Sequence, residues 1–210
     1  MKPLVEKLKK KGYLRNKSLE RAFLKIRREE FIPFKLKSLA VKDKPLPIGE
    51  GQTISQPAVV AFMMEMINPE KGDIILDIGS GSGWTTAILA EMVGESGKVC
   101  AIEKVEDLYE FGKENVNKFG FISNGRVDMV LGDGFEGLPE SSPFDKILVS
   151  AALDSEPIPE SWVDQLKEGG VIVVPIKNSI YKYVKKRDKL MKEEFPGFRF
   201  VPLVKKEDEK

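Results

Sequence analysis

Apolar residues in the first third of the chain recur mainly at helical spacing. Leu4, Val5 and Leu8 begin such a pattern, and a break near Gly12 divides it. This spacing predicts two short helices within residues 4–29. Residues 41–57 are dense in proline and glycine, which excludes a long helix and predicts an ordered loop. An apolar helical pattern then returns over residues 58–67.

From residue 74 onward, short apolar runs alternate with helical stretches. Strands are predicted at 74–78, 99–102, 127–131, 147–150 and 171–175, and helices at 85–93, 105–119 and, as a single turn, 162–166. Apolar strands that alternate with helices are typical of a parallel sheet covered on both faces. Residues 180–204 predict an added antiparallel strand pair, with Phe198, Phe200 and Val201 packing inward. The fold class is therefore α/β and doubly wound.

Composition narrows the possible functions. The 210 residues fit one domain, in which residues 1–57 form helices and a loop that pack on a core at 58–210. Thirty-four basic and 33 acidic residues give a net charge of only +1, which is unlike the strongly basic surface of a dedicated nucleic-acid binder. No apolar run reaches the roughly 20 residues of a membrane span, and no signal peptide is visible, so we expect a cytoplasmic protein. The chain has no histidine, and its single cysteine, Cys100, lies in an apolar run where we expect a buried strand residue.

A glycine-rich turn follows the first predicted strand and precedes a helix. It reads Gly79-Ser80-Gly81-Ser82-Gly83. Glycine lets a ligand approach the backbone, and the start of a helix offers free N–H groups to an anionic group. A dinucleotide fingerprint would need a glycine three residues after its second one, but Trp84 and Thr86 occupy the sixth positions of the two possible frames. The spacing therefore disfavours NAD.

Two acidic residues end the next two predicted strands. Glu103 closes the second strand, where a carboxylate can accept hydrogen bonds from ribose hydroxyls. Asp133 closes the third and could accept one from an adenine amino group. Ligands of open α/β sheets bind beyond the carboxyl ends of the strands. The turn and both acids together predict a nucleoside pocket there.

Several longer motifs carry a family resemblance. They are Pro-Leu-Pro-Ile-Gly-Glu-Gly-Gln-Thr-Ile-Ser-Gln-Pro at 45–57, Leu-Asp-Ile-Gly-Ser-Gly-Ser-Gly at 76–83, Gly-Asp-Gly at 132–134, Phe-Asp at 144–145, Ser-Ala-Ala at 150–152, Leu-Lys-Glu-Gly-Gly at 166–170 and Phe-Val-Pro-Leu at 200–203. With them the chain resembles the protein-L-isoaspartate O-methyltransferase family. The resemblance implies a seven-stranded class I methyltransferase fold and the cofactor S-adenosyl-L-methionine, with S-adenosyl-L-homocysteine as product.

The resemblance also implies a reaction and a set of site residues. The acceptor would be the free carboxylate of L-isoaspartyl residues in damaged proteins or peptides, methylated by a monomer without a metal, a membrane or nucleic acid. Ser55 would be catalytic, and Thr53, Ile54, Ser55 and Ala151 would bind the substrate. The cofactor would be bound by Thr53, Ile54, Asp77, Gly79, Ser80, Gly81, Ser82, Gly83, Glu103, Lys104, Asp133 and Gly134. A carboxylate acceptor ordinarily has a pKa near ~4, so it is ionised at neutral pH and needs no strong base.

The chain departs from the family pattern in three places, and these leave alternatives open. Ala58 stands where family members often have histidine, Leu153 stands in place of proline before the acidic run Asp154-Ser155-Glu156, and residues 177–198 diverge. One alternative is a methyltransferase for another carboxylate or a small molecule. Another is a cofactor-binding protein that has lost catalysis. For Ser55 the alternative role is to cap the helix that begins near Ala58.

Overall fold

The computed structural model describes residues 1–187 and 189–204, so residue 188 and the last six residues of the predicted 58–210 core lie outside the described residues. The first part contains α1 (Lys2–Lys10), α2 (Lys17–Lys25), the 3-10 helices η1 (Arg28–Phe31) and η2 (Phe34–Leu39), β1 (Leu46–Gly49), β2 (Gln52–Ile54) and α3 (Pro57–Ile67). The second part contains β3 (Ile74–Ile78), α4 (Trp84–Val93), β4 (Lys98–Glu103), α5 (Glu106–Asn117), β5 (Val127–Leu131), η3 (Pro139–Ser141), β6 (Phe144–Val149), α6 (Glu160–Asp164), β7 (Leu166–Ile176), β8 (Ser179–Lys186) and β9 (Lys189–Pro196).

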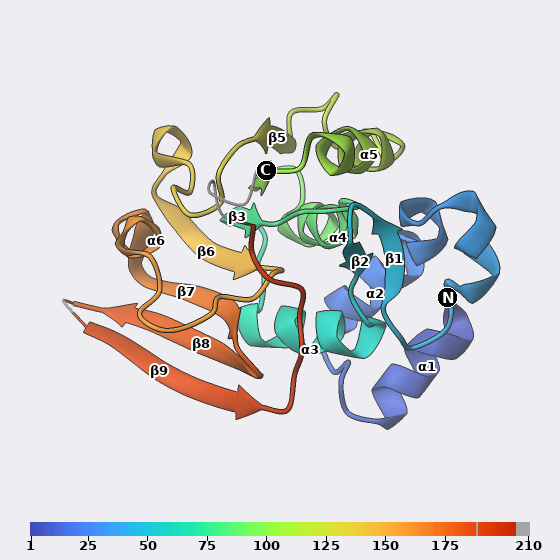
Figure 1. Ribbon diagram of the computed structural model, residues 1–210, viewed down its shortest axis with the longest axis horizontal. Helices are drawn as coiled ribbons and strands as arrows, with labels where there is room; N and C mark the ends of the chain where they lie inside the picture. The colour runs from blue at the N-terminus through green and yellow to red at the C-terminus, as the bar shows by residue number, and fades with distance from the viewer. Residues whose placement is uncertain (188, 205–210) are drawn as a thin grey trace.

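Seven strands form one mixed sheet in the order β5-β4-β3-β6-β7-β8-β9 (Figure 1). Neighbouring strands from β5 to β7 are parallel, and β8 and β9 continue the sheet as antiparallel strands. β4 and β6 flank β3 on either side, so the chain reverses its direction of travel across the sheet at β3. The predicted doubly wound sheet with an antiparallel C-terminal pair is confirmed.

Each strand in the middle of the sheet sends alternate side chains to opposite faces. In β3, Ile75 joins a core with α3, α4 and α5, whereas Leu76 joins a second core with Trp162 of α6. A strand with a side-chain period of two must be apolar on both faces when helices cover both. This explains why the strands read as continuous apolar runs. Cys100 of β4 is buried in the second core, as expected.

The first 57 residues share the core on the α4 side of the sheet. Both predicted N-terminal helices are present, and the side chain of Asn16 caps α2 by accepting hydrogen bonds from the N–H groups of Ser18 and Leu19. The segment predicted as a loop contains the β1–β2 hairpin instead. Its turn residues Glu50 and Gly51 both have positive φ, at 50° and 67°, which is the geometry of a tight hairpin turn.

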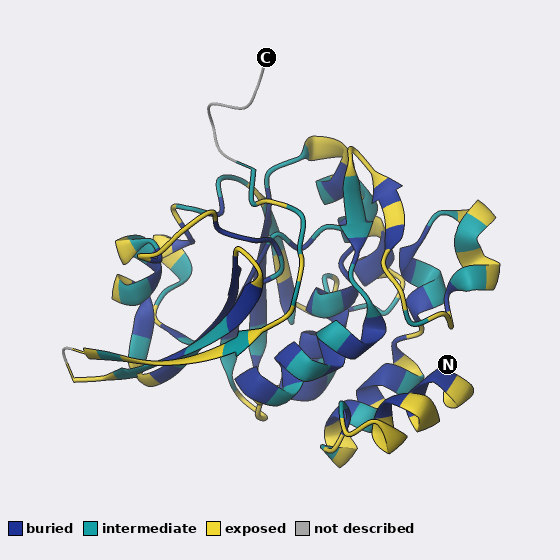
Figure 2. Cartoon of the chain, turned by 60° about the horizontal axis from the view of Figure 1, so that its bottom comes forward, coloured by how far each residue is buried: buried dark blue, intermediate teal, exposed yellow. Residues whose placement is uncertain are grey.

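The chain after β9 returns across the molecule toward the carboxyl end of β3. β9 itself is an edge strand that is exposed along most of its length (Figure 2). The rings of Phe198 and Phe62 then stack at 5.1 Å, and Leu203 donates its N–H to the carbonyl of Ala152. The predicted inward packing applies to Phe198 and Phe200, which pack partly buried against the core. This path places the C-terminal segment 201–204 beside the glycine turn.

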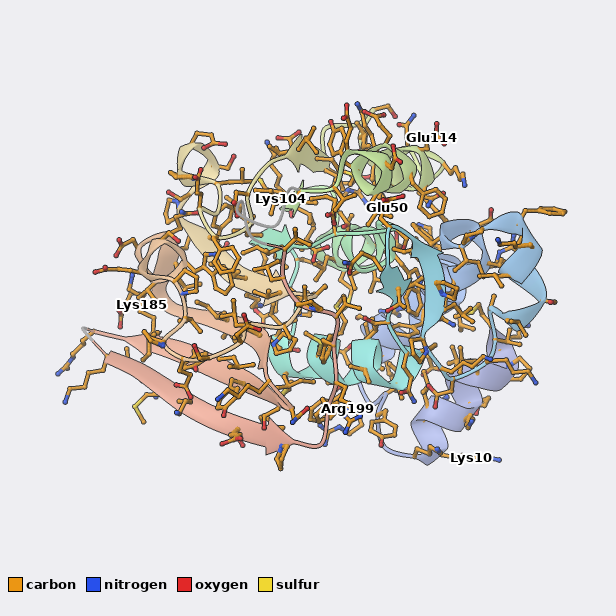
Figure 3. All side chains as sticks on the ribbon, viewed as in Figure 1. Lys10, Glu50, Lys104, Glu114, Lys185 and Arg199 are labelled. Carbon is orange, nitrogen blue, oxygen red and sulfur yellow. The ribbon has the colours of Figure 1, made fainter. Side chains whose placement is uncertain are left out.

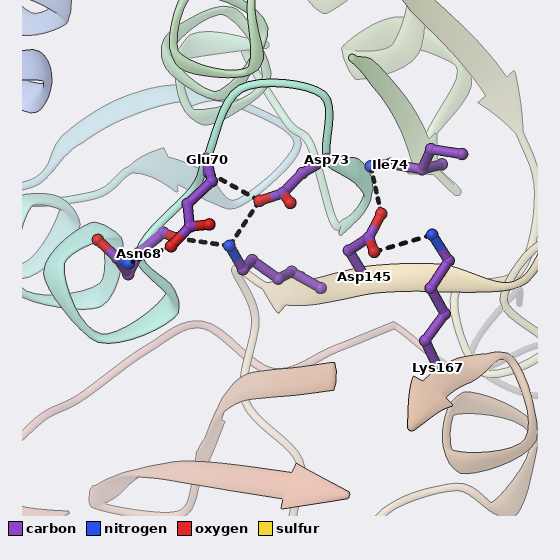
Figure 4. A network of polar contacts seen from close by, with 7 residues as sticks. Asn68, Glu70, Asp73, Ile74, Asp145 and Lys167 are labelled. Carbon is purple, nitrogen blue, oxygen red and sulfur yellow. Dashed lines mark hydrogen bonds and ion pairs between the residues drawn. The ribbon is translucent and has the colours of Figure 1, made fainter. Parts of the chain in front are cut away.

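Ion pairs and hydrogen bonds join the strands at their amino-terminal ends, opposite the glycine turn. Asp145 accepts hydrogen bonds from the N–H of Ile74 and from the Lys167 ammonium, both at 2.8 Å, and Lys146 pairs with Asp73 (Figure 4). These contacts fasten β6 to the start of β3, away from the glycine turn. None of the helices in residues 1–187 and 189–204 is long and apolar enough to cross a bilayer.

Candidate active site

A cavity of about 750 Å³, open solvent at its mouth included, lies at the carboxyl ends of the central strands. The β1–β2 hairpin, the glycine turn, the end of β4 and the C-terminal segment form its walls. Of the residues predicted for the site, those that line the cavity are Thr53, Ile54, Ser55, Gly79, Ser80, Gly81, Ser82, Glu103, Lys104, Gly134 and Ala151. Asp77, Gly83 and Asp133 are not among the lining residues.

Hydrogen bonds attach the glycine turn to the end of β4. The N–H groups of Gly79 and Ser80 both donate to the carbonyl of Ile102, at 2.9 and 3.2 Å. Gly79, Gly81 and Gly83 have φ values of 74°, 52° and 81°, which residues other than glycine rarely adopt. At Gly79 and Gly81, which line the cavity, the turn therefore presents backbone without a Cβ atom.

Asp77 lies beneath the turn, fully buried at the end of β3. Its Oδ2 accepts hydrogen bonds from the hydroxyls of Thr85 (3.0 Å) and Thr86 (2.7 Å). Burial raises the pKa of Asp77 to about 6, although the two threonine hydrogen bonds oppose this shift. Within the described part of the chain, Asp77 Oδ1 and the hydroxyl of Ser80 are buried without a hydrogen-bond partner. A buried polar atom without a partner usually has a water, an ion or a polar ligand beside it.

Glu103 connects the turn to the end of β4. Its Oε2 accepts from the N–H of Gly81 at 2.8 Å, and its Oε1 accepts from the N–H groups of Lys104 and Val105. A carboxylate has about four acceptor sites, so these three bonds leave capacity for a further hydroxyl. Asp133 accepts from the N–H of Phe135 and pairs with the Lys104 ammonium at 3.4 Å.

A groove on the outer surface meets the cavity at the segment between β2 and α3 that contains Ser55, here called the Ser55 loop. Thr53, Ser55 and Val201 line both. The groove is also lined by Tyr13, Pro45, Gln56, Ala58, Val59, Asn178, Gly197, Phe198, Arg199 and Phe200. Figure 3 labels Lys104, which lines the cavity, and Arg199, which lines the groove beside α3. Ser55 thus stands where a ligand in the cavity and a ligand in the groove would meet.

The structure does not support the alternative in which Ser55 caps α3. The N-cap residue of this helix is Gln56, and its side chain makes no capping hydrogen bond. The carboxylate of Asp43 accepts instead from the N–H of Ala58, at 3.0 Å. Two departures from the family pattern also have clear positions. Ala58 lines the groove, whereas Leu153 is buried in the second core and lies away from the cavity.

Sequence reasoning missed residues that support the site from behind. Gly112 of α5 lies so close to the turn that an added Cβ would come within 2.5 Å of the carbonyl of Gly81. Asn115, also buried, donates to the carbonyl of Ser82 at 3.1 Å. Leu203 and its neighbours close the cavity from the C-terminal side. A glycine inside a helical pattern was the only available signal for the first, and none existed for Asn115.

The reversal of strand order at β3, the glycine turn at its carboxyl end and the acid that ends β4 define a class I S-adenosylmethionine-dependent methyltransferase. Comparison with known proteins is more specific. The profile of the protein-L-isoaspartate(D-aspartate) O-methyltransferase family matches residues 1–208, and the chain belongs to this family. The resemblance noted from the motifs is confirmed.

Relatives named protein-L-isoaspartate O-methyltransferase match nearly the whole chain. The protein of Hyperthermus butylicus is 42% identical to this chain, and the match covers 96% of this chain and 87% of the relative. The protein of Ignicoccus hospitalis is 38% identical, and the match covers 97% of each chain. A solved protein-L-isoaspartate O-methyltransferase superposes with a TM-score of 0.86 at 34% identity, over 97% of this chain and 66% of that one. A β-aspartate methyltransferase from Plasmodium falciparum, solved with S-adenosyl-L-homocysteine, gives the same TM-score at 27% identity and covers 97% of both chains.

Proposed function

We propose that this protein methylates the free carboxylate of L-isoaspartyl residues in damaged proteins and peptides, with S-adenosyl-L-methionine as cofactor. It is an enzyme of protein repair. The observation that carries this proposal is the position of Ser55 and Thr53, which line both the cavity and the groove. One loop therefore faces a small cofactor on one side and a polypeptide on the other.

The residues of the cavity fit the cofactor chemically. The capacity left on Glu103 suits a ribose hydroxyl, and the hydroxyl of Ser80, a cavity-lining residue, has no hydrogen-bond partner in the described chain and suits a polar group of the amino acid part. We propose that Lys104 and Gly134 border the nucleoside. Asp133 is engaged by the N–H of Phe135, so any adenine contact of Asp133 would have to share that oxygen or use the one paired with Lys104.

The bound cofactor supplies a methyl group on a sulfonium, and the acceptor oxygen forms its bond to carbon as the carbon–sulfur electron pair passes to sulfur. The acceptor carboxylate is already ionised at neutral pH, so the protein has no proton to remove. The task of Ser55 is to donate a hydrogen bond that aims this carboxylate, with Thr53, Ile54 and Ala151 shaping the space around it. Orientation of this kind can supply about 7–11 kcal/mol of the barrier reduction.

The groove gives the proposed polypeptide substrate a surface beyond the reacting residue. Its walls combine the apolar side chains of Val59, Phe198 and Phe200 with the polar groups of Asn178 and Arg199. We propose that residues 1–57, which include the loop with Ser55, pack on the methyltransferase core from residue 58 and that both parts line the cavity and the groove. Monomeric action, a cytoplasmic location and the absence of a nucleic-acid partner are further parts of this proposal. Light scattering of the purified chain tests the first.

Transfer of a labelled methyl group to an isoaspartyl peptide, compared with the same peptide containing normal aspartate, tests the activity. We expect label only on the isoaspartyl peptide. Equal labelling of both, or labelling of small carboxylic acids alone, would indicate a different acceptor. Binding of S-adenosylhomocysteine without turnover would indicate a protein that has lost catalysis. Ser55→Ala should lower kcat while leaving S-adenosylhomocysteine affinity unchanged, with exposed Ser123→Ala as the control.

A further inference from the structure

A single buried arginine donates hydrogen bonds to backbone carbonyls on either side of the β1–β2 hairpin, including that of Ser55. Arg28, in η1, has no exposed surface, and its guanidinium donates hydrogen bonds to carbonyl oxygens from two separate segments. The acceptors are Ala40 (3.3 Å), Lys42 (3.2 Å), Lys44 (2.9 Å), Ile54 (3.3 Å) and Ser55 (3.0 Å). Two of these carbonyls belong to the residue predicted to be catalytic and to its neighbour.

The charge of Arg28 is balanced by these carbonyl dipoles and not by a direct ion pair. Among the described residues, no carboxylate forms an ion pair with Arg28, although the nearby charge of Asp43 favours its protonated form. Burial lowers the pKa of Arg28 to about 10, so the guanidinium is still charged at neutral pH. Its Cζ lies 5.5 Å from the centre of the Trp84 ring, and Trp84 also lines the cofactor cavity.

The loop is fixed on both sides of Ser55. Arg28 holds the carbonyl of Ser55, and Asp43 holds the N–H of Ala58 three residues later. These contacts fix the backbone from which the Ser55 side chain projects toward the cavity and the groove. We propose that Arg28 is a positioning residue for methyl transfer, which sets the place of the Ser55 hydroxyl through the carbonyls of Ile54 and Ser55.

A planar guanidinium is well suited to this role. It offers five N–H donors in a rigid fork, whereas a lysine ammonium offers three on a flexible stem. Arg28→Lys keeps the charge and most of the length but cannot hold all the carbonyls at once. Misplacement of a reacting group by 1 Å can cost about 100-fold in rate. We therefore expect a large fall in kcat from a substitution that leaves the fold intact.

The experiment compares Arg28→Lys and Arg28→Ala with Ile172→Ala, a buried β7 position outside both the cavity and the groove. We measure kcat on the isoaspartyl peptide, S-adenosylhomocysteine affinity, Tm and hydrogen exchange of residues 52–56. We expect Arg28→Lys to lose about 100-fold in kcat with S-adenosylhomocysteine affinity held within about threefold. Exchange in residues 52–56 should rise. Ethylguanidinium should restore part of the activity of Arg28→Ala, and ethylammonium should not.

Two results would overturn the inference. One is a kcat loss in Arg28→Lys no larger than that of Ile172→Ala at an equal loss of Tm. The other is unchanged hydrogen exchange in residues 52–56. The inference rests on the proposed function, but the two fail separately. An inactive wild-type chain would refute the proposed acceptor, and the exchange measurement would still decide whether Arg28 holds the Ser55 loop.

Discussion

Gly83 provides a test of what the last glycine of the turn does. It does not line the cavity, and a Cβ built on it would lie 2.7 Å from Val116 Cγ2 and 2.8 Å from the carbonyl oxygen of Gly112. Its φ is +81°. Gly83 therefore lets α4 begin directly against α5, and we predict that Gly83→Ala destabilises the protein without changing cofactor affinity.

The magnitude has two parts that a matched control separates. A left-handed backbone costs a residue with a Cβ about 1–2 kcal/mol, and overpacking adds about 1–3 kcal/mol. Gly125 has a similar φ of +74° with nothing within 4 Å of its added Cβ, so Gly125→Ala should show only the first cost. In a chain of this size, 1 kcal/mol shifts Tm by about 2–4 °C. Gly83→Ala should thus melt about 2–12 °C below Gly125→Ala.

Thermal unfolding followed by circular dichroism measures the stability difference, and calorimetric titration with S-adenosylhomocysteine at 25 °C measures affinity. Equal Tm losses in the two variants would refute the argument from close packing. So would a folded Gly83→Ala protein whose affinity falls by more than about tenfold, since that loss of about 1.4 kcal/mol would indicate a direct cofactor contact.

Three further predictions concern other parts of the fold. Because burial raises the pKa of Asp77 to about 6, the folded state binds the extra proton, and the contribution of Asp77 to stability falls as pH rises from about 4 to 6; urea unfolding across this range should show that fall, and Asp77→Asn should remove it. Lys146→Met leaves the half-buried Asp73 without its ion pair, so the free energy of unfolding should drop by about 1–3 kcal/mol while kcat at 25 °C stays unchanged. A loss of kcat would contradict a purely structural role for these contacts. Gly112→Ala should lower Tm although alanine is the better helix former, because its Cβ would meet the Gly81 carbonyl at 2.5 Å; a raised Tm would show that α5 can move away.

The order of elements was predictable because it depends on local pattern. The apolar runs of β3 and β4 and the glycine turn between β3 and α4 can be read from a few consecutive residues. The β1–β2 hairpin was missed because Pro47 and Gly49 disfavour strands, although Leu46 and Ile48 alternate with them and are both buried. An edge hairpin tolerates such residues because few of its N–H groups need a partner.

The candidate site was only partly predictable, for a physical reason. Glu103 and the glycine turn occupy the ends of neighbouring parallel strands, so the strand order alone brings them together. Asp133 ends the next strand, and its side chain accepts from the N–H of Phe135 and pairs with Lys104. Strand position fixes where a residue lies, and local hydrogen bonds decide which way its side chain points.

The sequence by itself determined the alternation of strands and helices, the glycine-rich turn, the motif that contains Ser55 and the absence of histidine, because each is a property of adjacent residues or of the composition. Only the tertiary structure decided that Arg28, distant in sequence, would lie under the Ser55 loop, and that Leu203 would close the cavity. A carbonyl can be satisfied by any donor that the fold brings near it, and no local pattern in the chain specifies which donor that is.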